Sequence, residues 1–402
     1  MVDWAQIYNP LFFILVIIFL YCCYILYFAL TVRRKRIKHE YFPYVSVLVY
    51  AKDAGNVIRR RIENLIKQNY PKNKYEIIIY DNASKDETQE ICMKYKKKKL
   101  IKYLRKKFDR KGPLLDLAIK KLAKGEILLM TDPDVLAEKN WILNIVQPFK
   151  DKSVGAVAGT VHCGNYYKGI IPLMRAVEDE WRFVAPVLRD SDTVFSIGAN
   201  QALRRETWEQ TKYGGSLLDD LDIISRIIDK GWKAVGSSAT GTEEEVETPG
   251  QYWRQRTRWY KVNTADYFGV SKKWKKFLES FPHVIQFFAL VLLIVFIISL
   301  SITFNYLIWF SIINFVLMNL AMIIAFIKIK TGKAFIPAIP LFLTLDTILF
   351  GTTLFWVHIP GRFFHLTKEV WPSLQGRYYH VGSELKKWFF EFEEKVKDYT
   401  KI

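Results

Sequence analysis

The stretch Glu126-Ile-Leu-Leu-Met-Thr-Asp-Pro-Asp134 joins a short apolar run directly to two aspartates. An apolar run of this length is typical of a buried strand. Similar runs precede it at Val45–Tyr50 and at Tyr75–Tyr80. Segments with helical spacing lie between the runs, at residues 57–68, 85–97 and 113–122. This alternation predicts an α/β domain with a mostly parallel central sheet over residues 41–267.

Acidic residues stand where two of these predicted strands end. Asp81 follows the second run, and Asp132 and Asp134 follow the third. In open parallel sheets, ligands bind at the carboxyl ends of the strands. Two carboxylates on a tight loop offer hard oxygen ligands to Mg²⁺ or Mn²⁺ and leave positions for water and phosphates. Asp-Pro-Asp is also good turn chemistry, and the pair alone favours a solvated turn.

A second acidic segment, Leu217-Leu-Asp-Asp-Leu-Asp-Ile-Ile-Ser-Arg226, predicts the start of a helix at Asp219 or Asp220. Carboxylates at a helix N-terminus are stabilised by the helix dipole, so capping is one interpretation. The other is a general base that takes a proton from an attacking hydroxyl. Spacing alone favours the cap.

The segment Trp253–Tyr260 carries three arginines among three aromatic residues. Guanidinium groups pair with phosphate oxygens in a bidentate manner, and an exposed tryptophan supports the apolar face of a sugar. A basic amphipathic helix lying on anionic lipid is the alternative that these residues leave open.

The net charge and the cysteine spacing limit the expected binding partners and the cellular compartment. The net charge of +19 suits anionic lipid, nucleotide phosphates or nucleic acid. No nucleic-acid-binding motif accompanies the charge, so nucleic acid is not an expected partner. The four cysteines show no disulfide or metal-binding spacing, which indicates a reducing compartment.

Long apolar segments predict a multi-pass protein of the cell membrane. No charged residue lies between Ala5 and Val32, which is enough for one span, and Arg33-Arg-Lys-Arg36 follows at once. The positive-inside rule then places the main body in the cytoplasm. Phe281–Ile327 is long enough for a helical hairpin, and Phe335–Val357 adds a further apolar stretch whose topology stays open. About four transmembrane helices are expected.

The predicted organisation has five parts. An anchor occupies residues 1–36, and the cytoplasmic α/β domain follows at 41–267. An interfacial helix is expected at 268–280, because Trp274 and Phe277 lie among lysines there. Transmembrane helices follow at 281–358 and an amphipathic tail at 359–402.

Five segments in order resemble the membrane-integrated branch of the family 2 glycosyltransferases. That branch has the GT-A fold and includes cellulose, chitin and hyaluronan synthases and ceramide glucosyltransferase. The matching segments are Tyr80-Asp-Asn-Ala-Ser-Lys-Asp-Glu-Thr88, Thr131-Asp-Pro-Asp134, Gly198-Ala-Asn-Gln-Ala-Leu-Arg-Arg205, Leu218-Asp-Asp-Leu-Asp222 and Gln255-Arg-Thr-Arg-Trp259. Each is weak alone, but the order and intervals agree over more than half of the chain.

The resemblance implies a binding site for a nucleotide-diphosphate sugar, with UDP the commonest nucleotide. Asp81 matches the residue that meets the base or ribose. Asp132 and Asp134 match the pair that holds Mg²⁺ or Mn²⁺ on the diphosphate, with Asp134 the direct ligand. Arg258 matches the arginine that closes over the diphosphate. Asp53 stands where the family has an asparagine, and the acidic residue that usually follows is absent, so one nucleotide contact differs.

The resemblance also implies a reaction. Asp220 matches the catalytic base of an inverting transfer, and Gln255 and Trp259 match residues that shape the acceptor site. A growing polysaccharide is the first acceptor that we consider. A lipid hydroxyl receiving a single sugar is the alternative, and a non-catalytic membrane scaffold is the third interpretation. Four spans are few for a polymer channel in one chain, so a homo-oligomer is left open.

Overall fold

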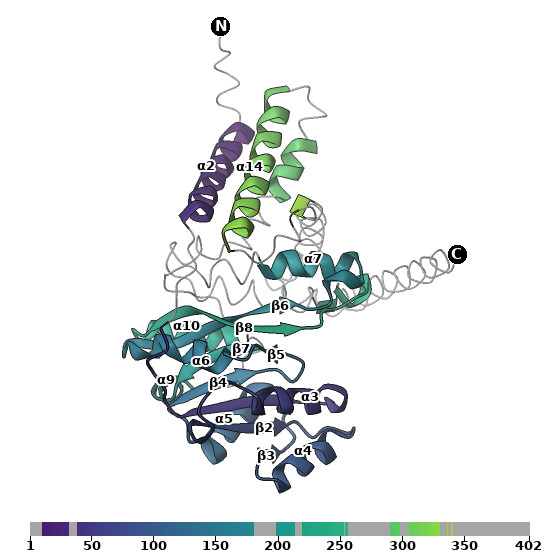
Figure 1. Ribbon diagram of the computed structural model, residues 1–402. Coiled ribbons are helices and arrows are strands. Elements are labelled where there is room, and N and C mark those ends of the chain that lie inside the picture. The colour runs from purple at the N-terminus through teal and green to yellow at the C-terminus, as the bar shows by residue number, and fades with distance from the viewer. Residues whose placement is uncertain are drawn as a thin grey trace, which may run out of the picture.

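The computed structural model describes residues 10–31, 38–180, 198–213, 219–252, 254–255, 290–297, 305–329, 336 and 339–340. Within these residues one eight-stranded mixed sheet forms the centre of the main domain, with the strand order β3-β2-β1-β4-β7-β6-β8-β5 (Figure 1). The strands are β1 (Val45–Ala51), β2 (Tyr75–Asp81), β3 (Lys102–Arg105), β4 (Ile127–Thr131), β5 (Leu136–Ala137), β6 (Val154–Cys163), β7 (Asn200–Arg204) and β8 (Lys233–Glu243).

The three strands predicted from apolar runs are confirmed as β1, β2 and β4. β1 lies between the other two and pairs in parallel with both, and β3 extends the parallel part beyond β2. β7 then pairs antiparallel with β4 and with β6, while β6 and β8 run parallel and the short β5 closes the edge antiparallel to β8. The sheet is therefore a mostly parallel mixed sheet, as expected for an α/β domain.

Helices cover both faces of the sheet. They are α3 (Gly55–Ile66), α4 (Thr88–Lys97), α5 (Lys111–Leu122), α6 (Trp141–Val146), α7 (Ile170–Asp179), α9 (Arg205–Thr211) and α10 (Asp219–Asp229). One apolar core joins alternate strand residues such as Val47 and Ile79 to α3, α4 and α6. A second core joins the intervening residues, such as Leu48 and Ile78, to α5, α9 and α10. Successive residues of a strand point to opposite faces of the sheet, so a strand that is buried on both faces contributes alternate residues to each core.

Three helix starts differ from the sequence prediction. α5 begins at Lys111 rather than at residue 113. α3 begins at Gly55 rather than at residue 57, because side chains at and just before the start of α4 accept from the backbone N–H groups of Ala54 and Gly55. α4 begins at Thr88 rather than at residue 85, because residues 84–86 bond to the β1–α3 loop instead. Tertiary contacts therefore set the starts of α3 and α4.

Two further helices are long and apolar enough to cross a membrane. They are α2 (Pro10–Thr31) and α14 (Asn305–Ile329), with candidate spans at Phe12–Thr31 and Leu307–Ile327. They lie side by side, and α7 runs between them and the sheet (Figure 1). Apolar residues of α7, including Met174 and Val177, share one buried cluster with both helices.

The remaining expectations about the membrane segments stay predictions. Residues 290–297 are helical, inside the expected hairpin. Three predicted segments lie wholly or mostly outside the described residues: the apolar stretch Phe335–Val357, the interfacial helix at 268–280 and the tail at 359–402. Four transmembrane helices are therefore not confirmed.

The glycine before β4 provides a test of the sheet packing. A Cβ at Gly125 would lie 2.3 Å from the backbone nitrogen of Ser46 and 2.7 Å from the carbonyl oxygen of Ile127. Backbone atoms of paired strands cannot move aside, so Gly125→Ala should cost at least about 2 kcal/mol. We expect the melting temperature to fall by about 5 °C or more in detergent. Lys124→Ala, which removes an exposed side chain, should change it little; equal losses would contradict this account.

Candidate active site

The strand register gathers the predicted site residues at one edge of the sheet. Ala51 of β1 lies opposite Asp81, and Val49 lies opposite Thr131, the residue before Asp132. Thr131 in turn lies opposite Asn200 at the start of β7. The carboxyl ends of β1, β2 and β4 and the first residues of β7 therefore meet at the same edge. This is the edge where ligands bind in open α/β sheets.

Asp81 is fully buried at this edge, and intrachain donors already bond both of its oxygens. Oδ1 accepts from the backbone N–H of Ser84 at 2.9 Å and from its hydroxyl at 2.6 Å. Oδ2 accepts from the hydroxyl of Tyr103 and lies 3.5 Å from Nε of Arg105. A buried carboxylate needs such partners. The contacts fix the carboxylate in place without exhausting its lone pairs.

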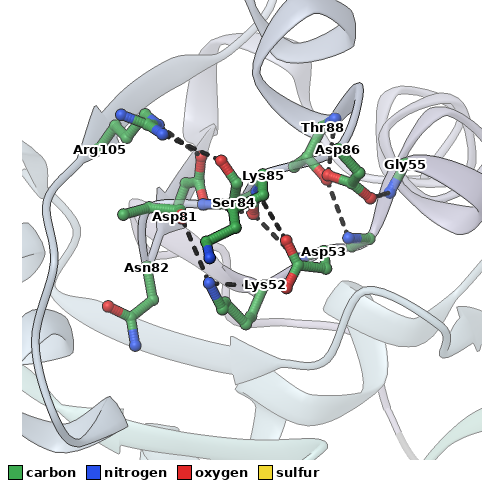
Figure 2. A network of polar contacts seen from close by, with 12 residues as sticks. Lys52, Asp53, Gly55, Asp81, Asn82, Ser84, Lys85, Asp86, Thr88 and Arg105 are labelled. Carbon is green, nitrogen blue, oxygen red and sulfur yellow. Dashed lines mark hydrogen bonds and ion pairs between the residues drawn. The ribbon is translucent and has the colours of Figure 1, made fainter.

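The loops after β1 and β2 are joined by hydrogen bonds between them (Figure 2). Asp53 accepts from the backbone N–H of Lys85 at 2.7 Å, and its own N–H donates to the Ser84 hydroxyl. Asp86 accepts from the N–H of Gly55 at 2.7 Å. Burial alone would raise the pKa of Asp86, but the hydrogen bonds from Thr88 and Gly55 lower it. Asp53 thus has a structural role here; its predicted nucleotide contact stays a prediction.

Asp132 and Asp134 stand on the loop after β4. Asp132 accepts a 2.6 Å hydrogen bond from Nζ of Lys111, the first residue of α5. Burial disfavours the charge of Lys111, but Asp132 outweighs this effect and raises the pKa of Lys111. Asp134 has no side-chain partner among the described residues. Desolvation, and then the charge of Asp132, raise the pKa of Asp134.

Arg61 lies beneath this loop and was not identified from the sequence. Its guanidinium is fully buried, donates to the Thr131 hydroxyl at 2.6 Å and stacks 5.2 Å from the ring centre of Trp141. Burial lowers its pKa to about 9, against the opposing effect of Asp132 and Asp134. One signal was present, because Arg61 lies three residues after Ile58 on the apolar face of the predicted helix.

Asp220 is near the N-terminus of α10, as predicted. Its Oδ2 accepts a 2.9 Å hydrogen bond from the backbone N–H of Gly198, next to the start of β7. Its carbonyl accepts from Nε2 of Gln201. Because β7 pairs with β4, these contacts place Asp220 at the edge that carries the loop after β4. The structure therefore brings the proposed base and the proposed metal pair together.

The predicted acceptor motif is described only at its start. Gln255 is partly buried, and its Nε2 lies 3.5 Å from Oε2 of Glu245. Arg258 and Trp259 lie outside the described residues. Glu243, at the end of β8, is a further acidic group at this edge. Burial, followed by Glu245 and neighbouring aspartates that include Asp134, raises its pKa well above the ordinary value.

The donor set fits a divalent cation. Asp132 and Asp134 offer hard oxygens, and a bound cation would relieve the repulsion that raises the pKa of Asp134. No group of three or more acidic, histidine or cysteine side chains suited to a metal occurs among the described residues.

Comparisons with known proteins agree with this geometry. Residues 46–211 match the family model for Glycosyl transferase family 2. The chain is 27% identical over 273 residues to "Probable glycosyltransferase YdaM" of Bacillus subtilis, an alignment covering 62% of this chain and 64% of that protein. It is 29% identical over 236 residues to a "Beta-monoglucosyldiacylglycerol synthase" of Trichormus variabilis, covering 54% and 48%. The chain thus spans about half to two thirds of these curated relatives.

The fold is also found in a solved structure. The mannosyltransferase PcManGT from Pyrobaculum calidifontis, solved in complex with GDP-Man and Mn²⁺, superposes with a TM-score of 0.53 at 21% identity. The match covers 80% of this chain and 99% of that one. The main domain therefore has a GT-A-like fold. Within this domain, residues 46–211 are the segment that matches the family 2 glycosyltransferase model.

Removal of one aspartate tests the metal site. Asp134→Ala should weaken Mn²⁺ binding at least tenfold, because it removes a charged ligand from a pair. The binding can be followed by the electron paramagnetic resonance signal of free Mn²⁺, in the presence of UDP. Asp151→Asn, which alters an exposed aspartate three residues before β6, is the control. Equal affinity in Asp134→Ala and wild type would contradict the assignment.

Proposed function

We propose that this chain is a metal-dependent, inverting glycosyltransferase that transfers one sugar from a nucleotide-diphosphate sugar to a lipid hydroxyl. The observation that carries the proposal is the meeting of Asp81, Asp132, Asp134 and Asp220 at one sheet edge. A nucleotide, a metal-bound diphosphate and an acceptor would need groups of these types within one site.

The proposed chemistry is a single displacement. The acceptor oxygen forms a bond to the anomeric carbon, the bond from that carbon to the diphosphate breaks, and Asp220 takes the hydroxyl proton. The Gly198 N–H holds one oxygen of Asp220, which orients the carboxylate. A divalent cation at Asp132 and Asp134 would offset the charge on the leaving diphosphate. Lys111 lies where its ammonium would add to that stabilisation.

The lipid acceptor rests on two observations. Curated relatives include proteins named for the synthesis of monoglucosyldiacylglycerol. In this chain α7 begins a few residues after the carboxyl end of β6 and shares one buried apolar cluster with α2 and α14, the two apolar helices. A bilayer around those helices would bring lipid headgroups near the acidic edge. A growing polysaccharide as the acceptor stays a prediction without specific support. A catalytic role is preferred to that of a non-catalytic membrane scaffold.

The proposed base has a direct test. Asp220→Asn keeps the size and hydrogen-bond acceptor of the side chain but cannot take a proton at neutral pH. We expect kcat to fall by about 10³-fold, while affinity for UDP and Mn²⁺ stays within a factor of about two. Sugar transfer and UDP binding by calorimetry measure the two effects. A kcat within tenfold of wild type would remove Asp220 from the role of base.

The acceptor class is tested with purified protein in nanodiscs. A panel of UDP-sugars and GDP-mannose, with Mn²⁺ or Mg²⁺, is incubated with and without dioleoylglycerol in the bilayer. The proposal expects nucleotide release that depends on the metal and on the lipid, with a product of one sugar per lipid by mass spectrometry. A high-mass polymer would instead support the polysaccharide acceptor. No release with any donor or acceptor would favour the scaffold.

A further inference from the structure

The loop after β8 connects the acidic edge to the acceptor motif, and its backbone is held firmly. Glu245 is buried in this loop. The Asn165 side chain accepts from the Glu245 N–H at 2.8 Å and donates to its carbonyl at 2.8 Å. Lys168 pairs with Glu247 at 2.9 Å. Ten residues separate Glu245 from Gln255, so this anchored loop fixes the point from which the acceptor motif starts.

A buried guanidinium fixes the Glu245 side chain. Arg175 of α7 is 1% exposed and pairs with Glu245 through Nη2. It also pairs with Glu178 at 2.7 Å and with Asp179 at 2.8 Å. Burial disfavours the charge of Arg175, but these three carboxylates outweigh it and raise its pKa. Arg175 is therefore a permanent cation that holds the Glu245 carboxylate in one orientation.

The other oxygen of Glu245 faces Gln255. Oε2 lies 3.5 Å from Nε2 of Gln255, at the outer limit of a hydrogen bond. A carboxylate only accepts, so it draws the NH₂ end of the amide and turns the oxygen end away. Oε1 of Gln255 is buried and has no hydrogen-bond partner among the described residues. A buried carbonyl oxygen in this position is suited to receive a hydroxyl.

We propose that Glu245, held by Arg175, is a positioning residue that orients the Gln255 amide so that its oxygen accepts a hydrogen bond from the acceptor hydroxyl. The proposal rests on the glycosyltransferase function proposed above and adds a determinant of acceptor binding. The proposal also assigns α7 a structural role between the apolar helices and the loop after β8. Met174 and Val177 of this helix belong to the same buried apolar cluster as residues of α2 and α14, while Arg175 reaches the acceptor loop. The helix thus links the apolar helices to the acceptor site.

The test compares two carboxylates that share Arg175. Glu245→Gln replaces an obligate acceptor by an amide that can donate or accept, so the Gln255 amide loses its fixed orientation. Glu178→Gln also removes a buried carboxylate from Arg175, but Glu178 pairs with Nη1 of Arg175 rather than with the Nη2 that holds Glu245. We expect Glu245→Gln to raise KM for dioleoylglycerol in nanodiscs about tenfold, with KM for the donor within twofold. Glu178→Gln should leave both constants within twofold of wild type.

A double-mutant cycle separates orientation from general damage. If Glu245 acts through Gln255, then Glu245→Gln added to Gln255→Ala should raise KM for dioleoylglycerol by no more than twofold further. A full tenfold increase in that background would overturn the proposal, as would equal effects of Glu245→Gln and Glu178→Gln. Melting temperatures of all variants are measured in the same nanodiscs, and the comparison uses variants within a few degrees of wild type.

Different results would contradict the positioning role of Glu245 and the proposed glycosyltransferase function. If wild-type protein transfers sugar to dioleoylglycerol and Glu245→Gln leaves its KM unchanged, the positioning role is wrong while the proposed function stands. If wild-type protein transfers sugar to no lipid with any donor, the proposed function is wrong, and the acceptor role of Gln255 is overturned with it.

Discussion

The parallel pairing of β1 with β2 on one side and β4 on the other is the constraint on which the site depends. Its register sets Ala51 beside Asp81 and Val49 beside Thr131, so the acidic residues that follow β2 and β4 emerge at one edge. A shift of the register by one residue would turn every side chain of β1 to the opposite face and separate its two apolar cores. The core that stabilises the sheet therefore also aligns the acidic groups.

Charge accumulates at that edge, and the fold balances it locally. Asp132 is paired with Lys111, Asp81 with Arg105, and Glu245 with Arg175. Asp134 and Glu243 are the acidic groups whose pKa is raised by burial and by neighbouring carboxylates. Such an arrangement is costly in an empty protein and favourable when a cation binds beside it. The electrostatics of the edge thus agree with a site that takes a metal together with an anionic diphosphate.

The sequence was sufficient for the parallel part of the sheet and for its acidic ends. The strands β1, β2 and β4 are continuous apolar runs, and Asp81, Asp132 and Asp220 follow strands or begin a helix at positions that local rules recognise. The strand β8 was not predicted, because Lys233–Glu243 is rich in Gly, Ala, Ser and Thr and lacks an apolar pattern. α7 was not predicted either, since Pro172 lies in its first turn among mixed residues.

Contacts between distant segments account for the rest. Arg61 reaches Thr131, and Arg175 reaches Glu245, over separations of 70 residues in each case. No local pattern encodes such pairs. The first arises when α3 lies beside the end of β4, and the second when α7, which follows β6, lies beside the loop after β8. The roles of Arg258 and Trp259 rest on the sequence resemblance alone, as these residues lie outside the described part of the chain.

The central claim is that one sheet edge binds a nucleotide diphosphate together with a metal. The most direct measurement is the anomalous difference density of Mn²⁺ in crystals grown with UDP. The account predicts one strong peak within metal-ligand distance of the Asp134 carboxylate, bridged to the diphosphate, with the uridine beside Asp81. A peak elsewhere, or UDP bound away from the carboxyl ends of β1, β2 and β4, would contradict it.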